Sequence, residues 1–195
     1  MKPRASFGVR GSMFSLATSA TAATLLLLCA FQAGGDELRG EAWVKKQAFK
    51  VATRYARSIS CETVTNLKNM VALIPWKNLK DDDERDRAQY ALVWYGDIGC
   101  SGGTGSSASH IAIVRISVGD SFLVDPAASS PIVKFDLSVE SRTKVLSASS
   151  DQLTLSGWDY GPEDAHCCPS VPVRISVKRD QHGNWAVINK TPAAH

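Results

Sequence analysis

The stretch Val-Pro-Val-Arg-Ile-Ser-Val-Lys, residues 171–178, alternates apolar side chains with other types. Alternation with a period of two predicts a β-strand with one buried face and one solvated face. Pro172 has no backbone N–H to donate, so the strand should begin at the edge of a sheet. Residues 171–178 therefore indicate an antiparallel sheet, the kind that can leave one face in water.

Six other segments have the same β-branched and aromatic character and are bounded by Gly, Ser and Asp. These segments are residues 90–95, 110–118, 121–125, 143–147, 152–158 and 185–189. The links at 119–120, 148–151 and 179–184 are short enough for antiparallel neighbours and too short for parallel ones. We therefore expect an antiparallel meander of about six or seven strands.

A helix is expected over residues 37–59, where there is no proline. Apolar residues recur there at three- and four-residue steps: Val44, Ala48, Val51, Tyr55 and Ile59. Basic residues follow the same steps on another face: Lys46, Lys50, Arg54 and Arg57. Such a helix buries its apolar face and leaves its basic face in solvent. Packed against the sheet, it gives an α+β fold.

Two segments between the helix and the first expected strand have their own signals. Residues 66–74 have the composition of a short helix, which Pro75 and Trp76 would end. Residues 81–87 are almost all charged, which is typical of an exposed loop or the start of a helix.

Residues 1–35 have the order of a secretory signal. Lys2, Arg4 and Arg10 are the only charged residues, and an apolar block around 25–28 is followed by the small residues Ala33 and Gly35. We expect cleavage near residue 35, a single domain over 36–190 and a disordered tail over 191–195. A retained signal anchor and a lipid on Cys29 are the alternatives, although Leu28 is a poor residue before a lipidated cysteine.

The charge balance of the expected mature domain is neutral. Residues 1–35 contain three of the 22 basic residues and no acidic one, which leaves 19 basic residues against 19 acidic ones. A nucleic-acid-binding protein is expected to carry surplus positive charge. We therefore expect no nucleic-acid partner, and membrane contact only through an uncleaved or lipidated N-terminal segment.

Four cysteines remain after the expected cleavage: Cys61, Cys100, Cys167 and Cys168. An even number fits an oxidising compartment, and four cysteines permit three pairings. A bond between Cys167 and Cys168 would close a very small strained ring. We therefore expect Cys167 and Cys168 each to bond one of Cys61 and Cys100, in an order that the sequence leaves open.

Several residue groups have the types found in functional sites. His166, Cys167 and Cys168, with Cys100 or His110, have metal-ligand side chains, but disulfide formation argues against a metal and we expect no cofactor. The segment 119–123, Gly-Asp-Ser-Phe-Leu, is similar to the nucleophile block of GDSL hydrolases. In that alternative Ser121 would be the nucleophile, and His166 follows downstream.

The run 158–170, Trp-Asp-Tyr-Gly-Pro-Glu-Asp-Ala-His-Cys-Cys-Pro-Ser, is followed by Val-Arg-Ile at 173–175 and Gly-Asn-Trp at 183–185. This C-terminal third resembles the LppP/LprE-type lipoprotein family, in which a Cys-Cys-Pro-Ser stretch precedes the last β-hairpin of a small exported domain. The resemblance implies an envelope location and no known chemistry. The chain departs from the family in its residues before Cys29 and in the helix expected at 37–59.

The function favoured by the sequence is a non-catalytic module, periplasmic or secreted, that binds a protein or cell-wall partner. An inhibitor or immunity-type protein for a periplasmic enzyme is an alternative. Two exposed loops, at 102–107 and 162–170, are the expected surfaces. The candidate binding residues in and beside them are Gly102, Gly103, Thr104, Tyr160, Asp164 and His166.

Overall fold

A computed structural model describes residues 39–102, 106–137, 143–165 and 168–193, and all structural statements refer to these residues. The expected signal segment 1–35, with Cys29, lies outside them, as do Gly103, Thr104, His166 and Cys167. None of the helices in the described ranges is long and apolar enough to span a membrane.

The expected N-terminal helix is present as α1, Glu41–Ile59. Its fully buried residues follow one another at four-residue steps: Val44, Ala48, Ala52 and Ala56. Three of these four are alanines, so the backbone of α1 can approach the sheet closely. The basic residues that the sequence assigns to the solvent face, from Lys46 to Arg57, are exposed.

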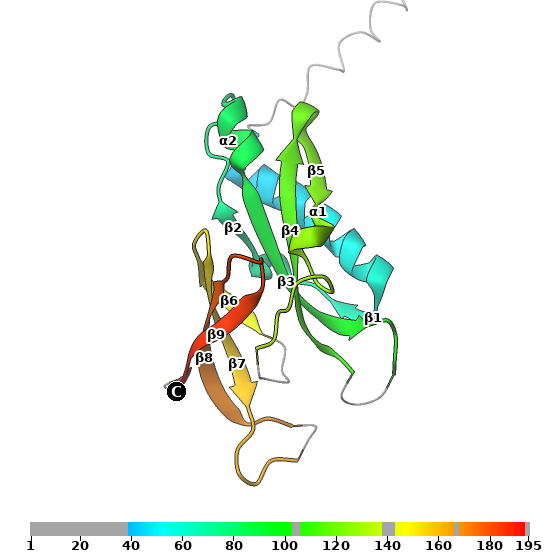
Figure 1. Cartoon of the computed structure of the whole chain (residues 1–195), viewed down its shortest axis with the longest axis vertical. Coiled ribbons are helices and arrows are strands. Elements are labelled where there is room, and N and C mark those ends of the chain that lie inside the picture. The colour runs from blue at the N-terminus through cyan, green and yellow to red at the C-terminus, as the bar shows by residue number, and fades with distance from the viewer. Residues whose placement is uncertain (1–38, 103–105, 138–142, 166–167, 194–195) are drawn as a thin grey trace, which may run out of the picture. The chain divides into compact units, whose positions relative to one another are not determined.

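The helix lies on sheet A, in which neighbouring strands run antiparallel in the order β1-β3-β4-β5 (Figure 1). The strands are β1 Ser60–Val64, β2 Met70–Ile74, β3 Gln89–Ile98, β4 Ala108–Ser117 and β5 Ser121–Val124. Both β1 and β2 pair with β3, β1 along its C-terminal part and β2 along its N-terminal part. The 3₁₀ turn η1, Leu67–Asn69, joins β1 to β2.

The second sheet, sheet B, is an antiparallel meander in the order β6-β7-β8-β9. Its strands are β6 Lys144–Ala148, β7 Gln152–Asp159, β8 Val171–Arg179 and β9 Trp185–Pro192. The three links predicted as hairpins all connect paired antiparallel strands, one in sheet A and two in sheet B. The stretch 171–178 forms most of β8, which lies between β7 and β9. The expectation that Pro172 lies at a sheet edge is therefore wrong, since Pro172 pairs with Trp158 of β7 and its carbonyl oxygen accepts a hydrogen bond from the backbone N–H of Ala193.

Sheet A is the middle layer, because its two faces contribute to two different clusters of buried residues. Tyr90, Leu92 and Trp94 of β3 pack with the buried face of α1. Ala91 and Val93, the alternate residues, pack with sheet B residues such as Leu155. This alternation follows from the period of two along a strand.

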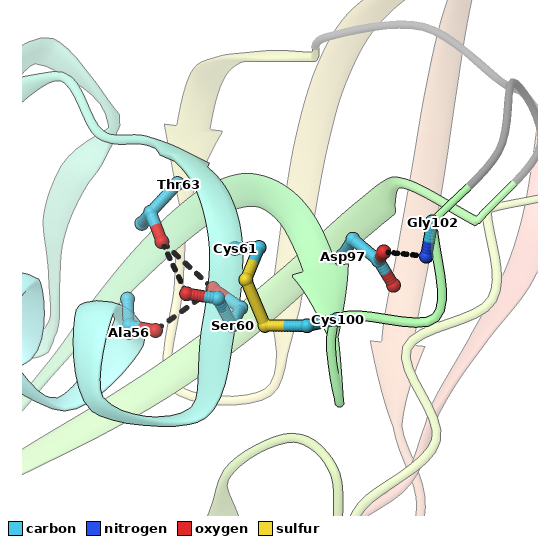
Figure 2. Close-up of a disulfide and its surroundings, with 7 residues drawn as sticks. All are labelled: Ala56, Ser60, Cys61, Thr63, Asp97, Cys100 and Gly102. Carbon is cyan, nitrogen blue, oxygen red and sulfur yellow. Dashed lines mark hydrogen bonds between the residues drawn. A yellow bond between two sulfur atoms is a disulfide. The ribbon is translucent and has the colours of Figure 1, made fainter.

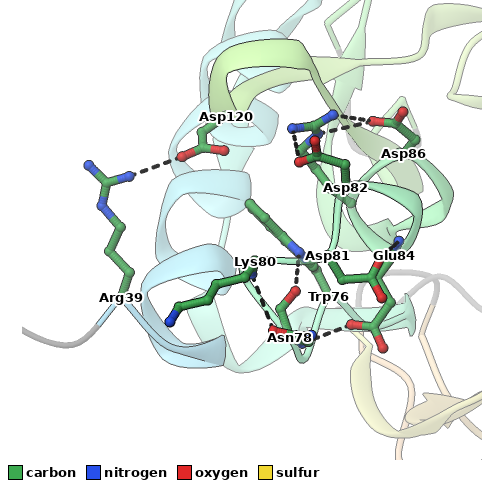
Figure 3. Close-up of polar contacts among 10 residues, drawn as sticks. Arg39, Trp76, Asn78, Lys80, Asp81, Asp82, Glu84, Asp86 and Asp120 are labelled. Atoms are coloured by element: carbon green, nitrogen blue, oxygen red, sulfur yellow. Dashed lines mark hydrogen bonds and ion pairs between the residues drawn. The ribbon is translucent and has the colours of Figure 1, made fainter.

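Short helices complete the fold. The charged segment 81–87 begins a helix as expected: α2, Asp82–Arg87, follows Asp81, whose side chain accepts a hydrogen bond from the backbone N–H of Glu84 (Figure 3). Arg85 is buried and is ion-paired with Asp82 and Asp86 at 2.7 and 2.9 Å. The 3₁₀ turns η2, Val118–Asp120, and η3, Pro126–Ala128, flank β5.

Three further expectations need correction. The strands form two sheets, and there are nine of them in the described residues, so a single meander of six or seven strands is wrong. Residues 66–74 form η1 and β2 in place of a short helix, because Met70–Ile74 can pair with β3. Strand β9 continues to Pro192, two residues into the expected tail, because Thr191 and Pro192 pair with β8.

Candidate functional site

The disulfide-bonded end of sheet A is defined by Cys61 of β1 and Cys100, two residues after β3. The two cysteines are bonded to each other, with their Cα atoms 5.1 Å apart (Figure 2). The pairing of β1 with β3 places Cys61 opposite Asp97. Gly99 and Cys100 then take positive φ angles of 81° and 55°, which turn the chain back toward β1.

This bond corrects the expected pairing of the cysteines. Cys61 and Cys100 close a link within sheet A, so neither is the partner of Cys168, which is also disulfide-bonded. The physical reason is the β1–β3 ladder, since β1 is a mostly polar segment that no sequence pattern marks as a strand. Strand pairing brings Cys61 and Cys100 within reach even though 39 positions separate them in sequence.

Asp97 organises the loop that follows Cys100. Its carboxylate accepts a hydrogen bond from the backbone N–H of Gly102 at 2.8 Å, and the residue is only 3% exposed. This hydrogen bond, with smaller contributions from Ser106, Ser101 and the charge of His110, holds the pKa of Asp97 below its ordinary value. Gly102, a predicted binding residue, therefore uses its N–H within the protein.

Asp164, another predicted binding residue, has a similar role in the second loop. Its carboxylate accepts hydrogen bonds from the backbone N–H groups of Gly161 and Ser170, at 2.6 and 2.7 Å, and from the Ser170 hydroxyl at 2.8 Å. These bonds, that from Gly161 first, lower the pKa of Asp164. Tyr160, another predicted binding residue, donates its backbone N–H to the carboxylate of Asp159.

A pocket of about 550 Å³, the His110 pocket, opens between the start of β4 and the segment after η3. Its lining includes Ile98, Ser109, His110, Ser130, Lys134 and Asp136. The His110 ring lies 4.6 Å from the Trp94 ring, and its Nε2 lies 3.0 Å from the carbonyl oxygen of Gly96. Burial lowers the pKa of His110, so the neutral imidazole is favoured.

A second hollow, the Lys68–Lys144 groove, has a volume of about 490 Å³ and is more enclosed than the His110 pocket. It lies between the β1–η1 segment of sheet A and β6 of sheet B. Its lining residues are Val64, Asn66, Lys68, Asn69, Trp94, Tyr95, Ser109, Thr143, Lys144, Val145 and Leu146. Both hollows share Ser109, so both open near the disulfide-bonded end.

The groove has no counterpart among the residues singled out from the sequence. Its walls come from Val64–Asn69 and Thr143–Leu146, and the side-chain amide of Asn69 joins them by hydrogen bonds to the backbone of Thr143 and Val145. No sequence pattern indicates that these two segments lie together, because their contact depends on how the strands of both sheets pair. Tyr95 of β3 is paired with Ser109 of β4. The predicted strand 90–95 includes Tyr95, and the predicted strand 110–118 begins one residue after Ser109.

Ser121, the nucleophile of the hydrolase alternative, is exposed at the start of β5, opposite Ser117. The preceding residues Gly119 and Asp120 have positive φ angles and form the hairpin turn. The Asp120 carboxylate is ion-paired with Arg39 at 3.0 Å (Figure 3). His166 lies outside the described ranges, so the two residues of that alternative are not brought together in the described part of the chain.

No cluster of three or more histidine, cysteine, aspartate or glutamate side chains suited to a metal ion occurs within the ranges that the structure describes. No protein-family model, curated protein or solved structure matches the chain. The candidate site therefore rests on the geometry of the disulfide-bonded end and its two hollows.

Proposed function

We propose that the chain is an exported, non-catalytic binding module of the bacterial cell envelope, which holds a protein or cell-wall partner at the disulfide-bonded end of sheet A. The Cys61–Cys100 bond and the disulfide of Cys168 support an oxidising compartment, where such bonds persist. The signal-like order of residues 1–35 and the resemblance to LppP/LprE-type lipoproteins support the envelope.

One observation carries the choice of this end of the molecule. The disulfide, the Asp97–Gly102 hydrogen bond and the two hollows all lie around the ends of β3 and β4. The segment Gly99–Gly102 is already held by a disulfide and a hydrogen bond, so it loses little conformational entropy when a partner binds, which favours affinity. In this proposal that segment and the walls of the two hollows form the surface for the partner.

Site-specific photo-crosslinking in bacteria that produce the full chain tests this proposal. A photoreactive residue at Ser101 or Lys134, both exposed at this end, is expected to give one defined adduct with an envelope protein or with cell-wall material. The matched control is Arg174, which is exposed on the face of sheet B turned away from sheet A. Equal labelling at Arg174, or no adduct at Ser101 and Lys134, would contradict the proposal.

The alternatives predict different results in the same cells. An inhibitor or immunity-type protein would give an adduct with one periplasmic enzyme and lower that enzyme's activity in stoichiometric mixtures. A hydrolase that uses Ser121 and His166 would hydrolyse ester substrates and lose that activity in the Ser121→Ala variant. Ester hydrolysis that disappears with Ser121→Ala would replace the binding proposal.

A further inference from the structure

The Lys68–Lys144 groove presents positive charge from two walls. Lys68 lies on η1 and Lys144 begins β6, and both line the groove. Among the described residues, neither lysine has an ion-pair partner within 4 Å and no acidic residue lines the groove. Two ammonium groups beside one hollow favour a negatively charged occupant.

Apolar surface lies beside these charges. Val64 and Leu146 line the groove and are 37% and 51% exposed, and Leu67 of η1 is 42% exposed. Large apolar side chains left in water around a concave surface are typical of binding sites. Tyr95 adds an aromatic residue to the lining.

The walls are held in place without a ligand. The side-chain amide of Asn69 donates to the carbonyl oxygen of Thr143 at 2.9 Å, and its oxygen accepts from the backbone N–H of Val145 at 3.2 Å. These two hydrogen bonds link η1 to β6, much as backbone hydrogen bonds link two neighbouring strands of a sheet. The volume of about 490 Å³ is within the usual range for small-molecule sites.

We propose that the Lys68–Lys144 groove binds a small amphiphilic anion, with its acidic group between the two lysines and its apolar body against Val64, Tyr95 and Leu146. The acidic group is a carboxylate, sulfonate or phosphate, because each of these pairs with an ammonium group. This goes beyond the proposed function, since it concerns a small ligand in the groove and requires neither an envelope location nor a macromolecular partner.

The test uses two dyes that differ mainly in one charged group. The dye 8-anilinonaphthalene-1-sulfonate carries a sulfonate, and N-phenyl-1-naphthylamine is its uncharged counterpart. The folded full chain is expected to bind one equivalent of the sulfonate dye, more tightly than the neutral dye. Amide NMR shifts caused by the sulfonate dye should centre on residues 64–69, 94–95 and 143–146.

Substitutions separate the two parts of the site. Lys68→Gln and Lys144→Gln should each weaken binding of the sulfonate dye about two- to fivefold, the effect of an exposed ion pair, and leave the neutral dye unchanged. Leu146→Asn should weaken both dyes. Lys178→Gln, an exposed lysine on sheet B, is the matched control and should change neither.

The proposal is overturned if the sulfonate dye shows no saturable binding, if both dyes bind equally, or if the lysine variants behave like Lys178→Gln. It is also overturned if the NMR shifts centre on α1 or on the outer face of sheet B. Thermal melts of each variant show that it is folded. Failure here leaves the crosslinking result at Ser101 and Lys134 unaffected, so the two proposals can fail separately.

Discussion

Asp97 and Asp164 both accept hydrogen bonds from backbone N–H groups of the loops that follow or surround them. A carboxylate used in this way fixes a loop and has its pKa lowered. Each residue therefore contributes to stability fully above the ordinary aspartate pKa of 3.8, and this contribution is lost as the pH falls through the lowered value.

His110 makes the free energy of unfolding depend on pH in a higher pH range than the two aspartates do. Burial lowers its pKa from 6.5, so below that pH the unfolded chain takes up a proton more readily than the folded protein does. The free energy of unfolding should decrease as the pH falls from about 6.5 toward the lowered pKa of His110. Urea unfolding at several pH values measures it.

The variant His110→Gln should lose the part of the slope just below pH 6.5, because glutamine does not titrate. His182, which is exposed in the β8–β9 turn, supplies the control substitution His182→Gln, which should keep the slope. A full slope in the His110→Gln protein would mean that another group is responsible.

Asn69 is the second residue with a measurable role. The substitution Asn69→Ala leaves the carbonyl of Thr143 and the N–H of Val145 without their partner, and should lower the free energy of unfolding by about 1–3 kcal/mol. Asn66→Ala, which removes only an exposed bond to the backbone N–H of Lys68, should cost less. Chemical denaturation of the two variants compares them, and equal losses would contradict the role of Asn69.

At the scale of elements, α1 and the seven strands from β3 to β9 can be predicted from the sequence, because their periodicities are clear and three of their links are short. Strands β1 and β2 cannot. The segment Ser60–Val64 is mostly polar, and Met70–Ile74 is a five-residue apolar run that periodicity cannot distinguish from a helix.

The missed strand explains the wrong cysteine pairing. Without β1 there is no ladder to place Cys61 opposite Asp97, and the only constraint left on the pairing is the ring strain of a bond between Cys167 and Cys168. The roles of the candidate binding residues could not be predicted from the sequence either. Gly102 and Asp164 were recognised as loop residues, but their hydrogen-bond partners become visible only once the loops have a conformation.

The packing of α1 on sheet A predicts a sharp difference between its two faces. Ala52 is fully buried among the residues that contact sheet A, so Ala52→Leu forces a larger side chain into a close-packed layer. We expect a loss of about 1–3 kcal/mol in the free energy of unfolding. Arg54→Leu, on the exposed face of the same helix, should change it by less than about 0.5 kcal/mol. Thermal and chemical denaturation check both values, and a tolerated Ala52→Leu would show that the helix does not pack as described.

At the scale of the whole molecule, sheet A is covered by α1 on one face and by sheet B on the other. The chain changes sheets after β5, where Ser129 and Ser130 bond to the β4 backbone at Ile113 and Ile111. These bonds continue the edge of β4 past the end of β5, and Phe135 then bridges to Trp185 of β9. No local pattern in the sequence signals that change.

The disulfide should contribute to the stability of the whole domain. It joins residues 39 positions apart, and closing a loop of that size in the unfolded chain corresponds to about 2–4 kcal/mol. The double variant Cys61→Ser, Cys100→Ser should therefore remain folded with a lower Tm and a lower midpoint in urea. An unchanged midpoint would mean that the bond does not form in the native protein.

Peptide mapping by mass spectrometry without reduction tests the central claim most directly. The protein, produced from the full chain and isolated without reducing agent, is alkylated, digested and analysed for linked peptides. The account predicts a linked pair containing Cys61 and Cys100, and no link from either of them to Cys167 or Cys168. A bond from Cys61 or Cys100 to Cys167 or Cys168, or free thiols at Cys61 and Cys100, would contradict the pairing of β1 with β3 and the site built on it.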